Sequence, residues 1–100
     1  MSEVLERRSV SRKTARDGKH EISASLASRL RALADTFDVT VDGVADRASI
    51  ASMPCTCQGP EAHEHWFLEA NALRAMEAGR EARVALGDDG RTLEISTKER

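Results

Sequence analysis

The sequence predicts one small domain of the α+β class. Its 100 residues are the length of a single domain. Residues 23–37 repeat apolar side chains at helical spacing, whereas residues 81–97 alternate apolar and polar side chains around a turn. We therefore expect one main amphipathic helix, a second short helix, short antiparallel strands and a C-terminal β-hairpin.

Residues 1–17 are interpreted as a basic, flexible N-terminal arm. Residues 1–20 hold six bases and three acids, a net charge of +3, while residues 21–100 hold nine bases and fourteen acids. The segment is polar and lacks a clear period, although "RRSVSRKT" permits a short strand. Asp17–Gly18 signals a turn, so residues 18–100 are expected to form the single α+β domain.

The main helix is expected in "SASLASRLRALADTF". Its apolar residues recur at spacings of four, three and four, which is one face of a helix; they are Leu26, Leu30, Leu33 and Phe37. A serine hydroxyl, from Ser23 or Ser25, can cap the first turn by accepting a bond from a backbone N–H. The preceding "KHEIS" is compatible with a short strand.

Two strands or a hairpin are expected after this helix. "VTV" at 39–41 runs into a turn at Asp42–Gly43, and "ASIASM" at 48–53 is apolar enough for a strand. At the other end, "GDDG" separates two alternating segments. Its flanking apolar pairs are expected to face each other: Val84 and Leu86 on one strand, Leu93 and Ile95 on the other.

A second, short helix is expected in "NALRAMEAG". Leu73 and Met76 share one of its faces, Asn71 can cap its start, and Gly79 suits the left-handed residue that ends a helix. The preceding "EAHEHWFLEA" at 61–70 is ambiguous. We favour a strand, and the alternative is a helix that begins at Pro60 and runs to Met76.

The chemistry of the sequence is concentrated in "CTCQGPEAHEH", residues 55–65. Both cysteines and two of the three histidines lie here, as Cys55, Cys57, His63 and His65. Residues two apart on a strand share a face. If the two halves pair antiparallel with Cys57 opposite His63 and Cys55 opposite His65, all four side chains converge. The same pairing puts Met53 opposite Phe67, beside the site.

Two thiolates and two imidazoles are a ligand set suited to tetrahedral Zn²⁺. Copper is an alternative, because it accepts the same ligands, and so is an iron–sulfur cluster; a further alternative is that no metal binds. Four protein ligands close the site, which predicts a structural or sensory role and argues against an enzyme. In the helical alternative the two histidines diverge, and the open site that remains, completed by Glu61 or Glu64, would allow a metal-dependent enzyme.

Other features indicate partners and location less specifically. No apolar run has the length of a membrane span, so no membrane partner is expected, and reduced thiols fit a cytoplasmic protein. Trp66 is a candidate protein contact. An adaptor function is the alternative to metal binding, with weak phosphate contacts from the cations of the arm: Arg7, Arg8, Arg12, Lys13 and Arg16.

Overall fold

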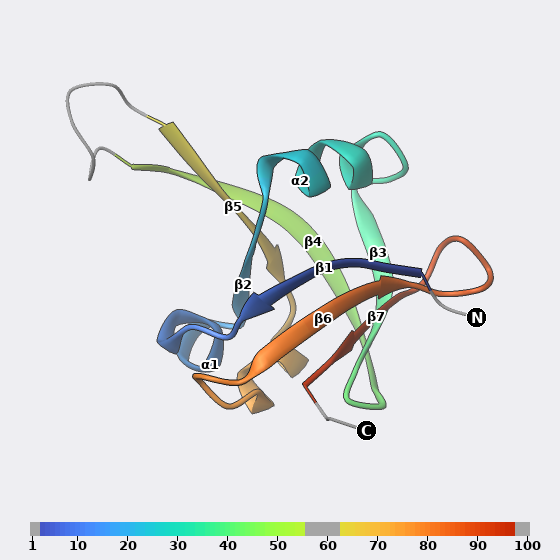
Figure 1. The fold of residues 1–100 in the computed structure, drawn as a ribbon. Coiled ribbons are helices and arrows are strands. Elements are labelled where there is room, and N and C mark those ends of the chain that lie inside the picture. Colours follow the sequence, from blue (N-terminus) through green and yellow to red (C-terminus); the bar gives the residue numbers. More distant parts are fainter. Residues whose placement is uncertain (1–2, 56–62, 98–100) are drawn as a thin grey trace.

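The computed structural model describes residues 3–55 and 63–97, and these form one seven-stranded sheet (Figure 1). The strands are β1 (Glu3–Ser9), β2 (Lys19–Ile22), β3 (Thr36–Val41), β4 (Val44–Cys55), β5 (His63–Glu69), β6 (Glu81–Leu86) and β7 (Leu93–Ser96). Two α-helices, α1 (Arg12–Asp17) and α2 (Ala24–Arg31), and a 3₁₀ helix, η1 (Asn71–Ala75), connect them. The strand order is β1-β6-β7-β3-β4-β5-β2, and only β3 and β7 run parallel.

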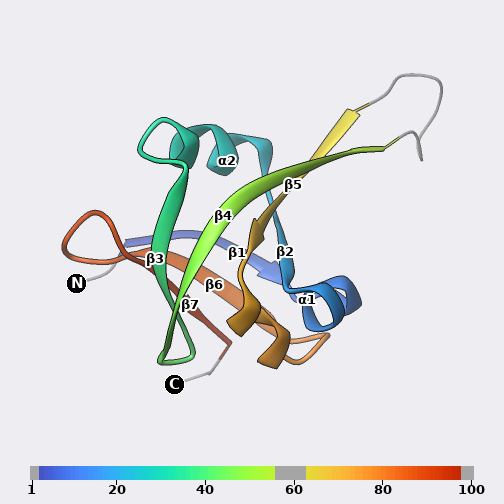
Figure 2. The same ribbon diagram turned by 180° about the vertical axis from the view of Figure 1, so that it is seen from behind.

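The expected α+β class is wrong. Strands make up about half of the described residues and helices about a fifth, and the single sheet curls into a nearly closed barrel. Figures 1 and 2 show α2 across one end of this barrel, while the paired β4 and β5 extend past it. The error has two sources: the main helix is shorter than its periodicity predicts, and the N-terminal segment contributes a strand.

The segment expected to be a flexible arm contains β1 and α1. β1 pairs antiparallel with β6 from Glu3↔Leu86 to Ser9↔Glu81. Ser11 caps α1 by accepting a bond from the Thr14 amide at 3.3 Å. Gly18 ends α1 at a φ of 71°, and a Cβ there would lie 2.7 Å from the Ala70 carbonyl oxygen. Glycine is therefore required where α1 meets the end of β5.

Side chains join the two ends of the strand order, where β1 and β2 face each other. The Arg8 guanidinium lies 3.6 Å from the Glu21 carboxylate, which bridges the two strands. The Glu6 carboxylate accepts a bond from the Ser23 amide at 3.2 Å, just after β2. We call this place the β1–β2 seam. Side-chain contacts close it, and the described residues show no backbone pairing between the two strands.

The main helix begins as expected and ends early. Ser23 caps α2 by accepting a bond from the Leu26 amide at 3.1 Å. The helix stops at Arg31, Leu33 is 57% exposed, and Phe37 belongs to β3. Phe37 is buried because its strand pairs with β4. The helical spacing of Leu33 and Phe37 with the preceding leucines is thus a coincidence of sequence, and tertiary pairing overrides it.

The expected second helix is a five-residue 3₁₀ helix, η1. Its first turn is capped from β4: the Asp46 carboxylate accepts a hydrogen bond from the Ala72 amide at 2.7 Å. This bond lowers the pKa of Asp46. Asn71 is therefore not the cap. Gly79 has a φ of 93° and donates its N–H to the Val10 carbonyl rather than ending a helix.

The predicted C-terminal hairpin is confirmed, and of the two arrangements predicted after the main helix the structure has the hairpin. β3 and β4 pair antiparallel around Asp42–Gly43, which both have positive φ, as a two-residue turn of this kind requires. β6 and β7 pair with Val84 opposite Ile95 and Leu86 opposite Leu93, as expected. The strand expected at 19–23 is β2, and the favoured strand at 61–70 is β5.

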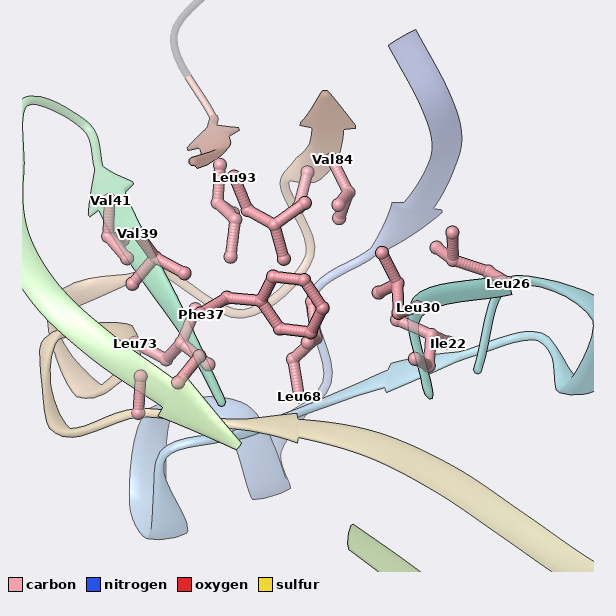
Figure 3. Close-up of a cluster of buried hydrophobic side chains, with 14 of the residues drawn as sticks. Ile22, Leu26, Leu30, Phe37, Val39, Val41, Leu68, Leu73, Val84 and Leu93 are labelled. Carbon is pink, nitrogen blue, oxygen red and sulfur yellow. The ribbon is translucent and has the colours of Figure 1, made fainter. Parts of the chain in front are cut away.

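Aliphatic side chains from the sheet and α2 fill the barrel interior (Figure 3). Leu30 projects from α2 toward Ile22, Phe37 and Leu68, which come from three strands. The side chains that are fully enclosed include Leu30, Leu68, Leu73 and Leu93, each 0% exposed. The core therefore rests on α2 covering one end of the barrel, because that places Leu30 over the strands.

Leu30→Ala and Leu33→Ala should separate the buried from the exposed leucine of the expected helix face. We expect Leu30→Ala to lower the free energy of unfolding by about 2–5 kcal/mol, because it empties volume in the core. Leu33→Ala should change it by less than about 0.5 kcal/mol. Urea titration of the two variants measures both values, and equal losses would contradict the early end of α2.

His20 is the one histidine enclosed in the described core. It is 0% exposed on the inner side of β2, and neither ring nitrogen has a hydrogen-bond partner among the described residues. Burial lowers the pKa of His20 from its ordinary 6.5, although the carboxylates of Glu6 and Glu21 oppose this shift. The folded chain therefore holds this ring in its neutral form more strongly than the unfolded chain does.

This burial predicts a loss of stability on acidification. As the pH falls below about 6.5, the unfolded chain takes up a proton at His20 before the folded chain does, so acid favours unfolding. This group lowers the free energy of unfolding by at most about 1.4 kcal/mol per pH unit. We expect urea titrations from pH 7 to pH 5 to show a steeper loss for the wild type than for His20→Met. Parallel pH profiles of the two proteins would contradict the prediction.

Candidate metal centre

Three of the expected ligands, Cys55, His63 and His65, belong to the part of β4 and β5 that extends beyond β2. β2 pairs with β5 only from Lys19↔Glu69 to Ile22↔Trp66. β4 and β5 continue as a two-stranded ribbon with the pairs Met53↔His65, Pro54↔Glu64 and Cys55↔His63. Figures 1 and 2 show this ribbon leaving the barrel. Three of the four expected ligand positions thus belong to one short stretch of paired strand.

The expected register of this ribbon is wrong by two residues. Cys55, not Cys57, pairs with His63, and Met53, not Cys55, pairs with His65. Phe67 pairs with Ala51 instead of Met53. A shift of two residues changes the opposed partners but leaves each paired strand position on the same face, because side chains alternate with a period of two. The shared face predicted for the positions of Cys55, His63 and His65 agrees with this register, whereas their predicted partners are wrong.

The structure describes only part of the expected ligand set. Cys57 lies outside the described residues, as do Glu61 and the rest of the connection at 56–62. Cys55 and His63 are placed through their backbone pairing, and His65 is placed with its side chain. Within residues 3–55 and 63–97, no group of three or more His, Cys, Asp or Glu side chains is gathered as a metal site would be.

His65 is held by a carboxylate from β2. Its Nδ1 lies 2.9 Å from Oε2 of Glu21, and both side chains are about one-third exposed. The Arg8 guanidinium approaches the same Glu21 oxygen at 3.6 Å. Sequence reasoning missed Glu21, because it lies 44 residues before His65 and only the pairing of β2 with β5 brings them together.

A pocket of about 330 Å³ adjoins His65 on the outer side of β2, β4 and β5. Lys13, on α1, forms part of its wall and places its ammonium group 5.1 Å from the centre of the Phe67 ring. Met53, Pro54 and Phe67 supply the apolar part of the pocket wall. The lining residues are Ser11, Lys13, Glu21, Met53, Pro54, His65 and Phe67.

The other candidate contacts are distributed over both sides of the sheet. Trp66 is half-buried against the core, with the Arg31 guanidinium 4.9 Å from its ring. Of the basic residues, Arg8 pairs with Glu6 and Glu21, and Arg16 pairs with Asp17 at 3.0 Å. These ion pairs reduce the charge that Arg8 and Arg16 offer to phosphate. A protein contact at Trp66 and phosphate contacts by the basic residues stay predictions.

Comparison with known proteins assigns the chain to no group. No protein-family model, curated protein or solved structure matches it. Among the helices in the described part of the chain, none is both long and apolar enough to cross a membrane. A functional interpretation must therefore rest on the site.

The observed register can be tested by cross-linking in a Cys57→Ser background. Adding His63→Cys should allow a disulfide with Cys55, because directly opposed strand residues have Cα atoms about 4.5–5.5 Å apart. Adding His65→Cys should not, because diagonal partners lie about 7–8 Å apart. Mass spectrometry after mild oxidation distinguishes the two. Faster bridging with His65→Cys would indicate the register predicted from sequence.

Proposed function

We propose that this protein binds one transition-metal ion, Zn²⁺, through Cys55, Cys57, His63 and His65, in a structural or sensory role. The observation that carries the proposal is the direct pairing of Cys55 with His63, with His65 two residues along the same strand. Strand alternation assigns these three positions to one face of the ribbon. A thiolate and two imidazoles on one face are a sufficient core for a zinc site.

The observed register supports a site centred on the Cys55–His63 pair. Directly opposed residues have Cβ atoms about 4.5–5.5 Å apart, and diagonal neighbours such as Cys55 and His65 are about 7–8 Å apart. Zinc binds sulfur at about 2.3 Å and nitrogen at about 2.0–2.1 Å. A long imidazole side chain can bridge the diagonal. Cys57 supplies the fourth ligand from the segment that follows β4, outside the described residues.

The location of the site suggests what the metal does. Beyond the pair Ile22↔Trp66, β4 and β5 are no longer flanked by β2. A two-stranded ribbon alone is only marginally stable. A metal ion held by both strands and by the segment between them ties this end of the ribbon together. Binding is then coupled to folding of the ribbon and releases protons as the thiols ionise.

We expect purified protein to carry about one equivalent of zinc, and Cys55→Ser to lose it. Elemental analysis measures the metal, and the absorption spectrum distinguishes colourless zinc from copper or an iron–sulfur cluster. Glu64→Gln is a matched control: the helical alternative made Glu64 a ligand, but on the observed strand Glu64 alternates with the two histidines and so lies on the opposite face of the ribbon. Metal-free wild type with both thiols open to titration, even after incubation with zinc, would refute the proposal.

The pocket beside His65 favours a second candidate, a metal-dependent enzyme with an open coordination position. His65 and Met53 line this pocket, so a ligand in it would lie next to the metal. Cys57→Ser distinguishes the two candidates. In a closed four-ligand site this substitution weakens zinc binding as strongly as Cys55→Ser does. In an open three-ligand site zinc binding survives, because water or a substrate takes the fourth position.

A further inference from the structure

We propose that Glu21 is a positioning residue for the metal site, which acts by orienting His65. This inference rests on the proposed metal-binding function and deepens it. Histidines that bind metals almost always donate their other ring N–H to a carboxylate, a carbonyl or water. Such a partner selects the tautomer, fixes the ring plane and makes the ligating nitrogen more basic. The Glu21–His65 contact has the form of this outer interaction.

The geometry of the contact determines which nitrogen binds the metal. Oε2 of Glu21 lies 2.9 Å from Nδ1 of His65, a hydrogen-bond distance. A carboxylate can only accept, so Nδ1 carries the proton and donates it to Glu21. The lone pair of the ring is then on Nε2. His65 is therefore expected to bind the metal through Nε2 and not through Nδ1.

Glu21 is itself held in place from two directions. Its backbone is fixed by β2, where it pairs with Phe67, two residues after His65 on β5. Its carboxylate is approached by the Arg8 guanidinium at 3.6 Å, and Arg8 also lies 3.6 Å from Glu6. A carboxylate oriented by a rigid strand and a guanidinium is suited to hold an imidazole in one direction.

The arrangement links the metal site to the β1–β2 seam. Arg8 belongs to β1, Glu21 to β2 and His65 to β5, so one chain of polar contacts runs from the seam to a proposed ligand. Metal binding at Nε2 strengthens the Nδ1–H donor toward Glu21.

The decisive variant is Glu21→Met, which keeps the length of the side chain and removes the acceptor. We expect its zinc affinity, measured by competition with a chelating indicator, to fall about 10- to 100-fold. Glu21→Gln should lose less, because its amide oxygen still accepts from Nδ1–H. Glu69→Met is the matched control: Glu69 lies on β5 and faces Lys19 at 3.9 Å, not His65. The control should bind zinc as the wild type does.

A measurement on the wild type makes the test independent of how the variants fold. Nitrogen chemical shifts of the zinc-loaded protein report which histidine nitrogens carry a proton and which bind metal. Protonated Nδ1 and metal-bound Nε2 at His65 are expected. Metal bound at Nδ1, or equal zinc affinity in the wild type and a folded Glu21→Met, would overturn this inference and leave the metal proposal standing. A wild type that binds no zinc would refute the metal proposal, and this inference with it.

Discussion

The pairing of β5 with β2 on one side and β4 on the other is the constraint on which the rest of the structure depends. It places Leu68 inside the barrel, where it packs with the core, and His65 outside, beside the carboxylate of Glu21. Because β2 stops at Ile22 while β4 and β5 continue, the same pairing creates the ribbon on which Cys55, His63 and His65 lie. Core and candidate site are thus products of one set of backbone hydrogen bonds.

Local signals in the sequence were sufficient for the elements whose partners are close in sequence. The turn at Asp42–Gly43 needs two residues with positive φ, and the sequence shows this directly. The alternation around "GDDG" likewise specifies which side chains of β6 and β7 face each other. β1 shows no alternation of apolar and polar residues, because most of its residues are polar, among them Glu6, Arg7 and Arg8. It is a strand because it pairs with β6, which is distant in sequence. The predicted length of α2 was wrong for a related reason. The apolar periodicity of the helix continues into residues that pair with β4 and so belong to β3.

Antiparallel pairing at the candidate site was predictable from the sequence, whereas its register was not. Alternation fixes which residues share a side of a strand, whereas register depends on the connection between the strands, and a shift of two residues leaves the face unchanged. The sequence therefore predicted correctly that the strands of Cys55 and His63 pair, and it assigned the wrong partners within that pairing. Glu21 was beyond the reach of sequence reasoning, because no pattern relates a carboxylate before α2 to a histidine 44 residues later.

Two histidines in this chain show how position in one sheet determines what an imidazole can do. His20 and Glu21 are neighbours on β2, yet His20 faces the core without a hydrogen-bond partner among the described residues, whereas Glu21 faces outward to His65. Burial lowers the pKa of the His20 ring, so acid favours unfolding, and its enclosure in the core closes the ring to ligands. The outer ring has a carboxylate partner, partial exposure and an adjoining pocket, which are the conditions a ligating histidine needs. The pleat of β2, which puts successive residues on opposite sides, separates these roles.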